Sequence, residues 1–310
     1  MLRFIAGRLA NIAVQVSVIA TAVFALFRMA PGDPAALILG ANATQSQVDV
    51  LREQMGLNQP IFVQFIEYLQ NLVQGDLGIS SSYSQPVMTV IMSRVDETAA
   101  LLILSLLIAT SIGLVGGVMA AVRPRSFFWR GTLLLWVLLL AVPNFWFGML
   151  LIQLFAVKLQ WLPAYGSAGM AGLILPAIAV SARLVALIAR LTRAAMLEIL
   201  GEDFIRTANS RGVSPVRLIL VHALKPAFPS VLVLIGLQAG YLFGGAVVVE
   251  NLFSYPGMGQ LLLAAVSQRD YTLMQGITIF FVAGFLIINL CVDIVSSRID
   301  PRIQIQRAKA

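Results

Sequence analysis

The residue types that usually carry out catalysis or hold metals are scarce in this chain. It has one histidine, His222, and one cysteine, Cys291, which cannot make a nucleophile–base pair or a metal-binding set. No segment has the form G-x-x-x-x-G-K-[ST], in which backbone N–H groups and a lysine hold the phosphates of ATP. We therefore expect a non-enzymatic chain with no catalytic residue, no metal site and no cofactor of its own.

A second kind of chemistry comes from polar groups within apolar segments. Arg183 and Asp293 are ionisable residues in such segments. Because a charge in hydrocarbon is unfavourable, such residues face a protein partner or a water-filled path. Arg183 could instead reach the membrane surface near Arg190 or pair with Asp293. Asn144 and Gln238 are uncharged polar residues that hydrogen-bond between helices or line a pathway. The candidate residues of a translocation pathway are Asn144, Arg183 and Gln238.

The elements that position these residues are membrane spans. Of the 310 residues, 59% are hydrophobic and 11% are charged, and the mean hydropathy is +0.89. Soluble domains carry about 25% charged residues. Six segments approach the roughly 20 apolar residues that cross a bilayer, and Pro143 is expected to kink the third. They cover residues 9–27, 99–122, 131–157, 173–189, 228–249 and 272–295. The sequence thus predicts an all-α, polytopic bundle of six transmembrane helices.

The distribution of basic residues orients these spans. Most of the 21 Lys and Arg residues fall at the termini and in the second and fourth connections between spans. Cytoplasmic loops carry this excess, so we expect both termini in the cytoplasm. The net charge of +7 is then explained by orientation in a lipid bilayer, and no nucleic-acid partner is expected.

The spans divide the chain into three parts. Residues 1–29 would form the first transmembrane helix, residues 30–98 an external loop or cap, and residues 99–310 a core with five spans and a cytoplasmic loop over residues 190–227. Residues 30–98 contain apolar residues at three-to-four spacing, which predicts helices. A small folded cap is favoured over a disordered acidic loop, because the latter would leave those apolar stripes in water.

The cytoplasmic loop contains residues that are typical of the ends of two helices. Glu202 and Asp203 are acidic residues where a helix N-terminus favours them. Gly212 is expected to end that helix in a left-handed conformation. Ser214 could then cap a second helix with its hydroxyl, and Pro215 suits the first helical position. The pattern predicts a helix, a glycine turn and a second helix.

The second helix of the loop is predicted to be amphipathic. One stripe is made of Val216, Ile219, Leu220, Ala223 and Leu224. Such a stripe could lie against lipid headgroups, against the protein's own bundle, or in a groove of another protein. The groove is favoured, because a rigid loop with a glycine turn suits the transmission of force from a soluble motor.

At this loop the sequence resembles the permease subunits of binding-protein-dependent ATP-binding-cassette importers of the dipeptide, oligopeptide and nickel group. The family's motif E-A-A, three residues, G falls on Arg206-Thr207-Ala208 and Gly212, where Ala208 and Gly212 match. Further resemblances occur in order along the chain. They are Pro31-Gly32-Asp33-Pro34, Gly75-Asp76-Leu77-Gly78, Val249-Glu250-Asn251-Leu252-Phe253, Tyr255-Pro256-Gly257, Arg269-Asp270-Tyr271 and Asp300-Pro301-Arg302.

The resemblance implies the type I importer permease fold in the bacterial cytoplasmic (inner) membrane, and it implies partners. These are a second homologous permease subunit, two cytoplasmic ATP-binding subunits that bind ATP and Mg, and an extracytoplasmic substrate-binding protein. The binding protein would dock at Asp76, Tyr255, Pro256, Gly257 and Asp270. The ATPase-coupling loop would comprise Glu202, Asp203, Arg206, Thr207, Ala208, Gly212, Ser214, Pro215, Val216, Ile219 and Leu220.

The implied cargo is a small peptide. The same machinery could import a nickel chelate, glutathione or an opine-like compound. A stand-alone secondary transporter would need intramembrane carboxylates or histidines, and this chain offers only Asp293.

Overall fold

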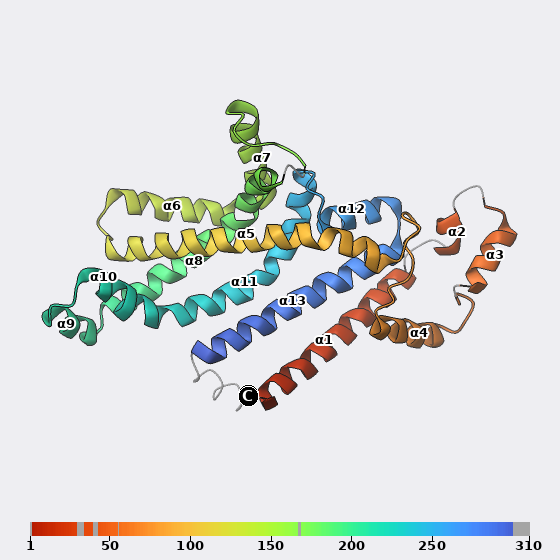
Figure 1. The fold of residues 1–310 in the computed structure, drawn as a ribbon, viewed down its shortest axis with the longest axis horizontal. Coiled ribbons are helices and arrows are strands. Elements are labelled where there is room, and N and C mark those ends of the chain that lie inside the picture. Colours follow the sequence, from red (N-terminus) through yellow and green to blue (C-terminus); the bar gives the residue numbers. More distant parts are fainter. Residues whose placement is uncertain (1, 30–33, 40–42, 55, 167–168, 300–310) are drawn as a thin grey trace. The chain divides into compact units, whose positions relative to one another are not determined.

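The computed structural model describes residues 2–29, 34–39, 43–54, 56–166 and 169–299, and within these ranges every regular element is a helix (Figure 1). This confirms the predicted all-α class. Residues 31–33 and 300–302, which carry two of the sequence resemblances, lie outside these ranges.

The helices form two compact units. Unit 1 comprises Met1–Thr98 with Pro256–Leu286, and unit 2 comprises Ala99–Tyr255 with Ile287–Ala310. Residues 256–286 thus group with the N-terminal part of the chain.

Unit 1 contains four helices of the N-terminal part: α1 (Leu2–Met29), α2 (Pro34–Leu39), α3 (Gln45–Gln54) and α4 (Ile61–Gln74). It also contains the start of α5 (Val87–Val122), all of α12 (Met258–Gln268) and most of α13 (Tyr271–Ile299). The helices α3 and α4 confirm the helical pattern predicted within residues 30–98. Helix α4 packs on α1 through Phe24, whose ring centroid lies 5.3 Å from that of Phe65 and 5.4 Å from that of Tyr68.

Unit 2 is built around α8 (Met170–Leu200). Helix α6 (Phe127–Ala141), α7 (Asn144–Leu151) and α11 (Lys225–Leu252) pack against it. The end of α5 approaches α8 so closely that a Cβ atom on Gly117 would lie 2.6 Å from the carbonyl oxygen of Ala189. The connection from α8 to α11 contains α9 (Asp203–Ser210), α10 (Pro215–Arg217) and the π-helix η2 (Leu218–Leu224).

Among the described residues, five helices are long and apolar enough to cross a membrane, and a bent pair brings the number to six if it is counted as one span. The predicted third span is this pair, and the break at Pro143 is sharper than the expected kink. Helix α6 ends at Ala141, Val142 is extended, and α7 with the π-helix η1 (Ile152–Lys158) continues after a bend of 115°. Pro143 explains the break, because it has no N–H for a helical hydrogen bond and disfavours a helical conformation at the preceding residue.

Candidate functional site

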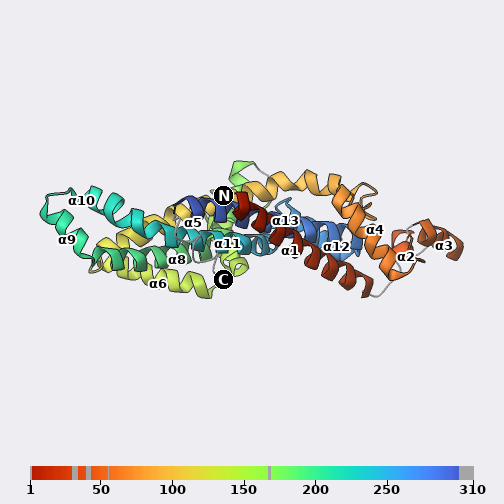
Figure 2. The same cartoon turned by 90° about the horizontal axis from the view of Figure 1, so that it is seen from below.

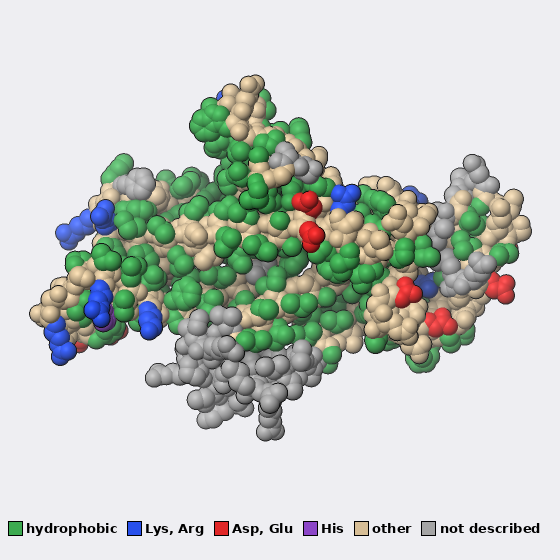
Figure 3. Space-filling model, viewed as in Figure 1, with side chains coloured by type: hydrophobic (Ala, Val, Ile, Leu, Met, Phe, Trp, Pro, Cys, Tyr) green, Lys and Arg blue, Asp and Glu red, His purple; other side chains and the backbone are tan. Residues whose placement is uncertain are grey.

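The predicted coupling loop lies at one end of unit 2. Both views of the ribbon place α9 and α10 there, close to the turn between α5 and α6 (Figures 1 and 2). Basic side chains gather at this end, whereas apolar side chains cover the long sides of the unit (Figure 3). Exposed basic residues at this end include Arg123, Arg125, Arg206, Arg211 and Arg217.

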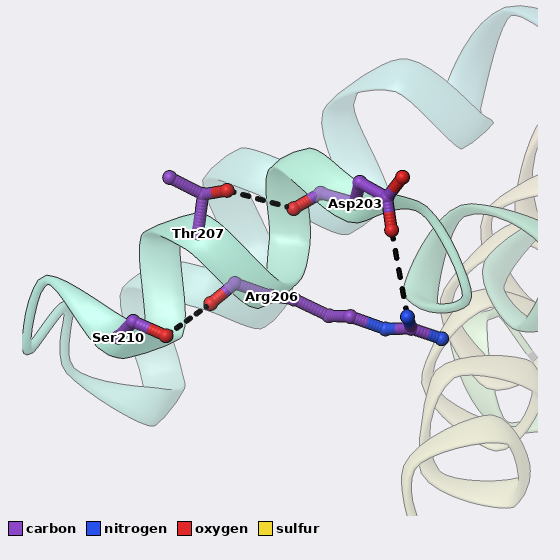
Figure 4. A network of polar contacts seen from close by, with 4 residues as sticks. All are labelled: Asp203, Arg206, Thr207 and Ser210. Atoms are coloured by element: carbon purple, nitrogen blue, oxygen red, sulfur yellow. Dashed lines mark hydrogen bonds and ion pairs between the residues drawn. The ribbon is translucent and has the colours of Figure 1, made fainter.

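Helix α9 is held together by contacts along its own length. It begins after Glu202, and Asp203 lies in its first turn, as predicted. The Thr207 hydroxyl donates to the carbonyl oxygen of Asp203 at 3.0 Å, and the Ser210 hydroxyl donates to that of Arg206 at 3.0 Å (Figure 4). The guanidinium of Arg206 lies 3.5 Å from the carboxylate of Asp203. Because this ion pair is exposed, it adds little stability.

Gly212 ends α9 in the way the sequence predicted. Its φ is +78°, in the left-handed region. The N–H of Val213 donates to the carbonyl of Ala208 at 3.3 Å, and the N–H of Gly212 donates to that of Asn209 at 3.0 Å. These two bonds form a Schellman motif, which satisfies carbonyls at the end of the helix. A Cβ atom at Gly212 would meet nothing within 4 Å, so the backbone conformation alone favours glycine.

The start of the second helix agrees with the prediction only in part. Pro215 is the first helical residue, as expected. The proposed cap is wrong, because the Ser214 side chain makes no capping hydrogen bond. The backbone carbonyl of Ser214 instead accepts from the N–H of Leu218 at 2.9 Å.

The second helix is not a separate short rod. Helical structure runs without interruption from α10 through η2 into α11, so it extends from Pro215 to Leu252. In a π-helix the hydrogen bonds connect residues i and i+5, which widens the turn. The loop helix and the predicted fifth span are therefore one continuous helix.

The predicted apolar stripe is divided between two environments. Ala223 is buried with Met196 and Val118 of the bundle, and Leu218, Ile219 and Leu224 pack against the same cluster. Val216 and Leu220 face outward, with exposed fractions of 67% and 52%. Val221 is exposed beside them. The stripe thus anchors the loop on its own bundle and still offers apolar side chains at the surface.

The three candidate pathway residues occupy different positions. Arg183 is exposed on α8, and no hydrogen bond or ion pair joins it to another described residue. Asn144 lies at a crossing of α7 and α11, since its Nδ2 atom would be 3.1 Å from a Cβ atom on Gly245. Gln238 is half-buried on α11. The side chain of Asp293 is not among those described. A charge at mid-bilayer costs about 2.5–3.5 kcal/mol on insertion scales, so Arg183 is the unusual member of this set.

The predicted docking residues for a binding protein are mostly not at the surface. Asp270 has an exposed fraction of 0%, and Tyr255 one of 2%. Gly257 is buried and Pro256 is partly buried. Asp76 is exposed, and its carboxylate accepts from the N–H of Gly78 at 2.8 Å. The surface position expected for Asp270, Tyr255 and Gly257 is therefore wrong.

Asp270 has a structural task in unit 1. Its carboxylate accepts from the hydroxyl of Ser80 at 2.5 Å, from the N–H of Ser82 at 3.0 Å and from the N–H of Leu273 at 3.0 Å. The last bond caps the N-terminus of α13. Burial acts to raise the pKa of Asp270, but these hydrogen bonds to the charged form lower it below its ordinary value. We name this arrangement the Asp270 clamp.

A second long-range cap lies nearby in unit 1. The hydroxyl of Thr98 accepts from the N–H of Met258 at 2.8 Å, at the start of α12. The guanidinium of Arg94 donates to the carbonyl of Pro256 at 3.4 Å. Sequence reasoning missed both contacts, which join residues more than 150 positions apart. A capping signal was available at Asp270, which directly precedes an apolar helix.

Comparison with known proteins places the chain among transporters. Residues 113–305 match the family described as binding-protein-dependent transport system inner membrane component, and residues 1–102 match the N-terminal part of such membrane components. A glutathione transport system permease protein, GsiC, from Escherichia coli O6:H1 is 40% identical over 98% of this chain and 99% of its own length. The GsiC protein of Shigella dysenteriae serotype 1 is 39% identical over the same shares.

A solved structure shares the fold. A chain of the MetNI methionine ABC transporter, in an inward-facing conformation, superposes with a TM-score of 0.59. It covers 69% of this chain and 97% of its own, at 19% sequence identity.

Proposed function

Since this chain belongs to the family of binding-protein-dependent transport system inner membrane components, a multi-pass permease family of the inner membrane, we propose that it forms half of a pathway that imports small peptides. Glutathione, itself a tripeptide, is the leading candidate cargo. The observation that carries this proposal is the 40% identity to a permease named for glutathione transport, over nearly the full length of both chains. A nickel chelate or an opine-like compound is the alternative cargo.

The machinery of this proposal has four further subunits or proteins. A second, homologous permease completes the pathway, and two cytoplasmic ATPases bind ATP and Mg and power it. An extracytoplasmic binding protein delivers the cargo. The exposed basic residues at the α9 end of unit 2 support a cytoplasmic position for that end, because basic residues mark cytoplasmic loops. Both termini are then cytoplasmic as well.

The coupling surface of the proposal is the outward face of the loop between α8 and α11. Phe204, Val216, Leu220 and Val221 expose apolar area there, and Arg206, Arg211 and Arg217 surround them with positive charge. Apolar residues within a polar rim are typical of a protein interface. ATP binding would draw the two ATPases together and move both coupling loops, which would open the pathway outward, and hydrolysis would reset it inward.

The binding protein would approach unit 1 over a different set of residues from that first expected. Asp76, Ile79, Tyr83 and Arg269 are exposed there. The segment from Ser80 to Ser82 is held by the Asp270 clamp. The clamp therefore contributes by positioning this surface, while the exposed residues make the contact.

Uptake of defined cargo tests the proposal. The two permeases and the ATPases would be reconstituted in proteoliposomes with their binding protein, and uptake of labelled glutathione, a dipeptide and a nickel chelate would be measured with and without ATP. We expect ATP-dependent uptake of glutathione or the dipeptide, or both. ATP-dependent uptake of the nickel chelate alone would refute the peptide assignment, and uptake without the ATPases would refute the importer assignment.

A further inference from the structure

Helix α8 has one face that the other described helices of unit 2 leave open. Helices α6, α7 and α11 pack against it, and α5 approaches it at Gly113 and Gly117. The residues that these contacts bury near the middle of α8 are Ala182, Leu184, Val185, Ala186, Ile188 and Ala189. Arg183 and Arg190 are exposed, and Leu187 between them is half-buried. Because residues at i, i+4 and i+7 share a helix face, these three form one open strip.

The chemistry of the open strip does not fit hydrocarbon. A helix face that meets lipid is apolar, whereas Arg183 lies near the middle of a helix that qualifies as a membrane span, with Arg190 nearer its α9 end. No carboxylate of the described residues pairs with Arg183. One turn further on, the Nε atom of Arg193 is buried without a hydrogen-bond partner. The described side chains of unit 2 therefore supply no charged partner for Arg183.

The preferred partner of an arginine in such a place is a carboxylate. The guanidinium group is planar and always charged, and it donates two parallel hydrogen bonds to the two oxygens of one carboxylate. The spacing of Arg183 and Arg190 along the helix is about 10 Å at 1.5 Å per residue. One carboxylate cannot bind both side chains in this way at once, so the two arginines are successive positions along the strip.

We propose that Arg183 binds a carboxylate of the cargo during passage, and that Arg190 is the next position toward the α9 end. This inference rests on the proposed function and adds a substrate class to it, namely peptides with a free carboxylate. Glutathione belongs to this class, since it carries one carboxylate at each end. The arginines then bind cargo without a carboxylate charge, such as a peptide carboxamide, more weakly.

The test compares two cargoes that differ only in this group. One is a peptide with a free C-terminal carboxylate, and the other is the same peptide as the carboxamide. Uptake by the reconstituted transporter is measured for wild type, Arg183→Gln and Arg183→Lys, with Arg125→Gln as a control that removes an exposed arginine elsewhere in unit 2. Each rate is divided by the wild-type rate for the same cargo. We expect Arg183→Gln to lower uptake of the free acid by about tenfold or more while that of the carboxamide is unchanged. Arg183→Lys should retain more activity toward the free acid than Arg183→Gln.

Two uptake results would overturn the inference. An equal loss for both cargoes means that Arg183 pairs with a partner subunit or supports the fold, and no loss for either means that the strip does not meet the cargo. A labelling experiment distinguishes failure of this inference from failure of the proposed function, because labelling needs no cargo. In the assembled transporter with Cys291→Ser, Arg183→Cys should react faster with an anionic than with a cationic water-soluble thiol reagent, since Arg190 remains. Absence of labelling would also overturn the inference, whereas uptake of neither peptide by wild type would refute the proposed cargo.

Discussion

Gly212 permits a prediction whose magnitude follows from the backbone alone. A Cβ atom at this position meets no neighbour within 4 Å, so a substitution adds no steric conflict with other residues. The remaining penalty is the left-handed conformation at φ +78°. This costs about 1–2 kcal/mol for a residue with a Cβ atom, more for a β-branched residue and less for asparagine. A cost of 1–2 kcal/mol lowers the population of the native turn by a factor of about 5–30.

The assay measures coupling and abundance together. Uptake per ATP hydrolysed would be determined in proteoliposomes for Gly212→Asn, Gly212→Ala and Gly212→Val, and the amount of protein in the membrane would be quantified. We expect coupling to fall in the order asparagine, alanine, valine, with valine blocking transport while the protein remains in the membrane. Gly75 provides a matched control, because its φ is +79° and a Cβ atom there also meets nothing within 4 Å. Gly75→Val should cost similar stability without uncoupling ATP hydrolysis from transport.

Two outcomes would refute this reasoning. Transport at the wild-type rate by Gly212→Val would show that the turn is not required. Equal damage from asparagine and valine would show that the requirement is not the left-handed backbone.

Three further predictions concern other parts of the chain. Asp270→Ala should lower the thermal stability of the purified protein by about 1.5–3 kcal/mol, because it removes hydrogen bonds to a charged acceptor. Those bonds hold the Asp270 pKa below its ordinary value, so the stabilisation should be complete above about pH 4 and lost as the pH falls through the lowered pKa. Thermal denaturation at several pH values would detect this loss in the wild type, and Asp270→Ala should not show it. Gly117→Ala should lower the melting temperature, because the new Cβ atom would meet a backbone oxygen at 2.6 Å. Gly244→Ala should leave the melting temperature unchanged, because there is open space around Gly244. Equal melting temperatures for the two variants would contradict the packing argument. Val216→Glu and Leu220→Glu should weaken co-purification of the ATPases while Val216→Ile and Leu220→Met preserve it, and unchanged co-purification of the glutamate variants would argue against the coupling surface.

The preferences of residues for helix ends and for apolar spacing correctly predicted the elements that depend only on residues close together in the sequence. The positive φ of Gly212 and the position of Pro215 followed from the preferences of single residues at helix ends. The helices α3 and α4 followed from apolar spacing. The family and the membrane spans followed from motifs and hydropathy distributed along the whole chain.

The errors arose at positions whose structure depends on residues far away in the sequence or on the hydrogen-bond pattern of a helix. Asp270 was assigned to the surface because its partner, Ser80, is 190 positions away and nothing in the sequence links them. The stripe at Val216 was drawn with α-helical spacing, whereas η2 has π-helical bonds and brings Leu218 to the bundle instead of Leu220. Pro143 was recognised as a kink, but the size of the bend depends on what α7 packs against, which is α8.

In the π-helical segment η2, from Leu218 to Leu224, the hydrogen-bond pattern determines how far the helix turns over a given number of residues. A π-turn holds one residue more than the α-turn it replaces, and each residue of an α-helix turns the axis by about 100°. If the same seven residues of η2 adopted α-helical bonds, they would turn the helix further by about that amount, and everything before η2 would rotate relative to α11. Val216 would then point away from its present direction although its identity was untouched. A change of the hydrogen-bond pattern in this segment would thus twist the coupling surface, whereas the loss of one residue together with a return to α-helical bonds would leave the direction of that surface nearly unchanged.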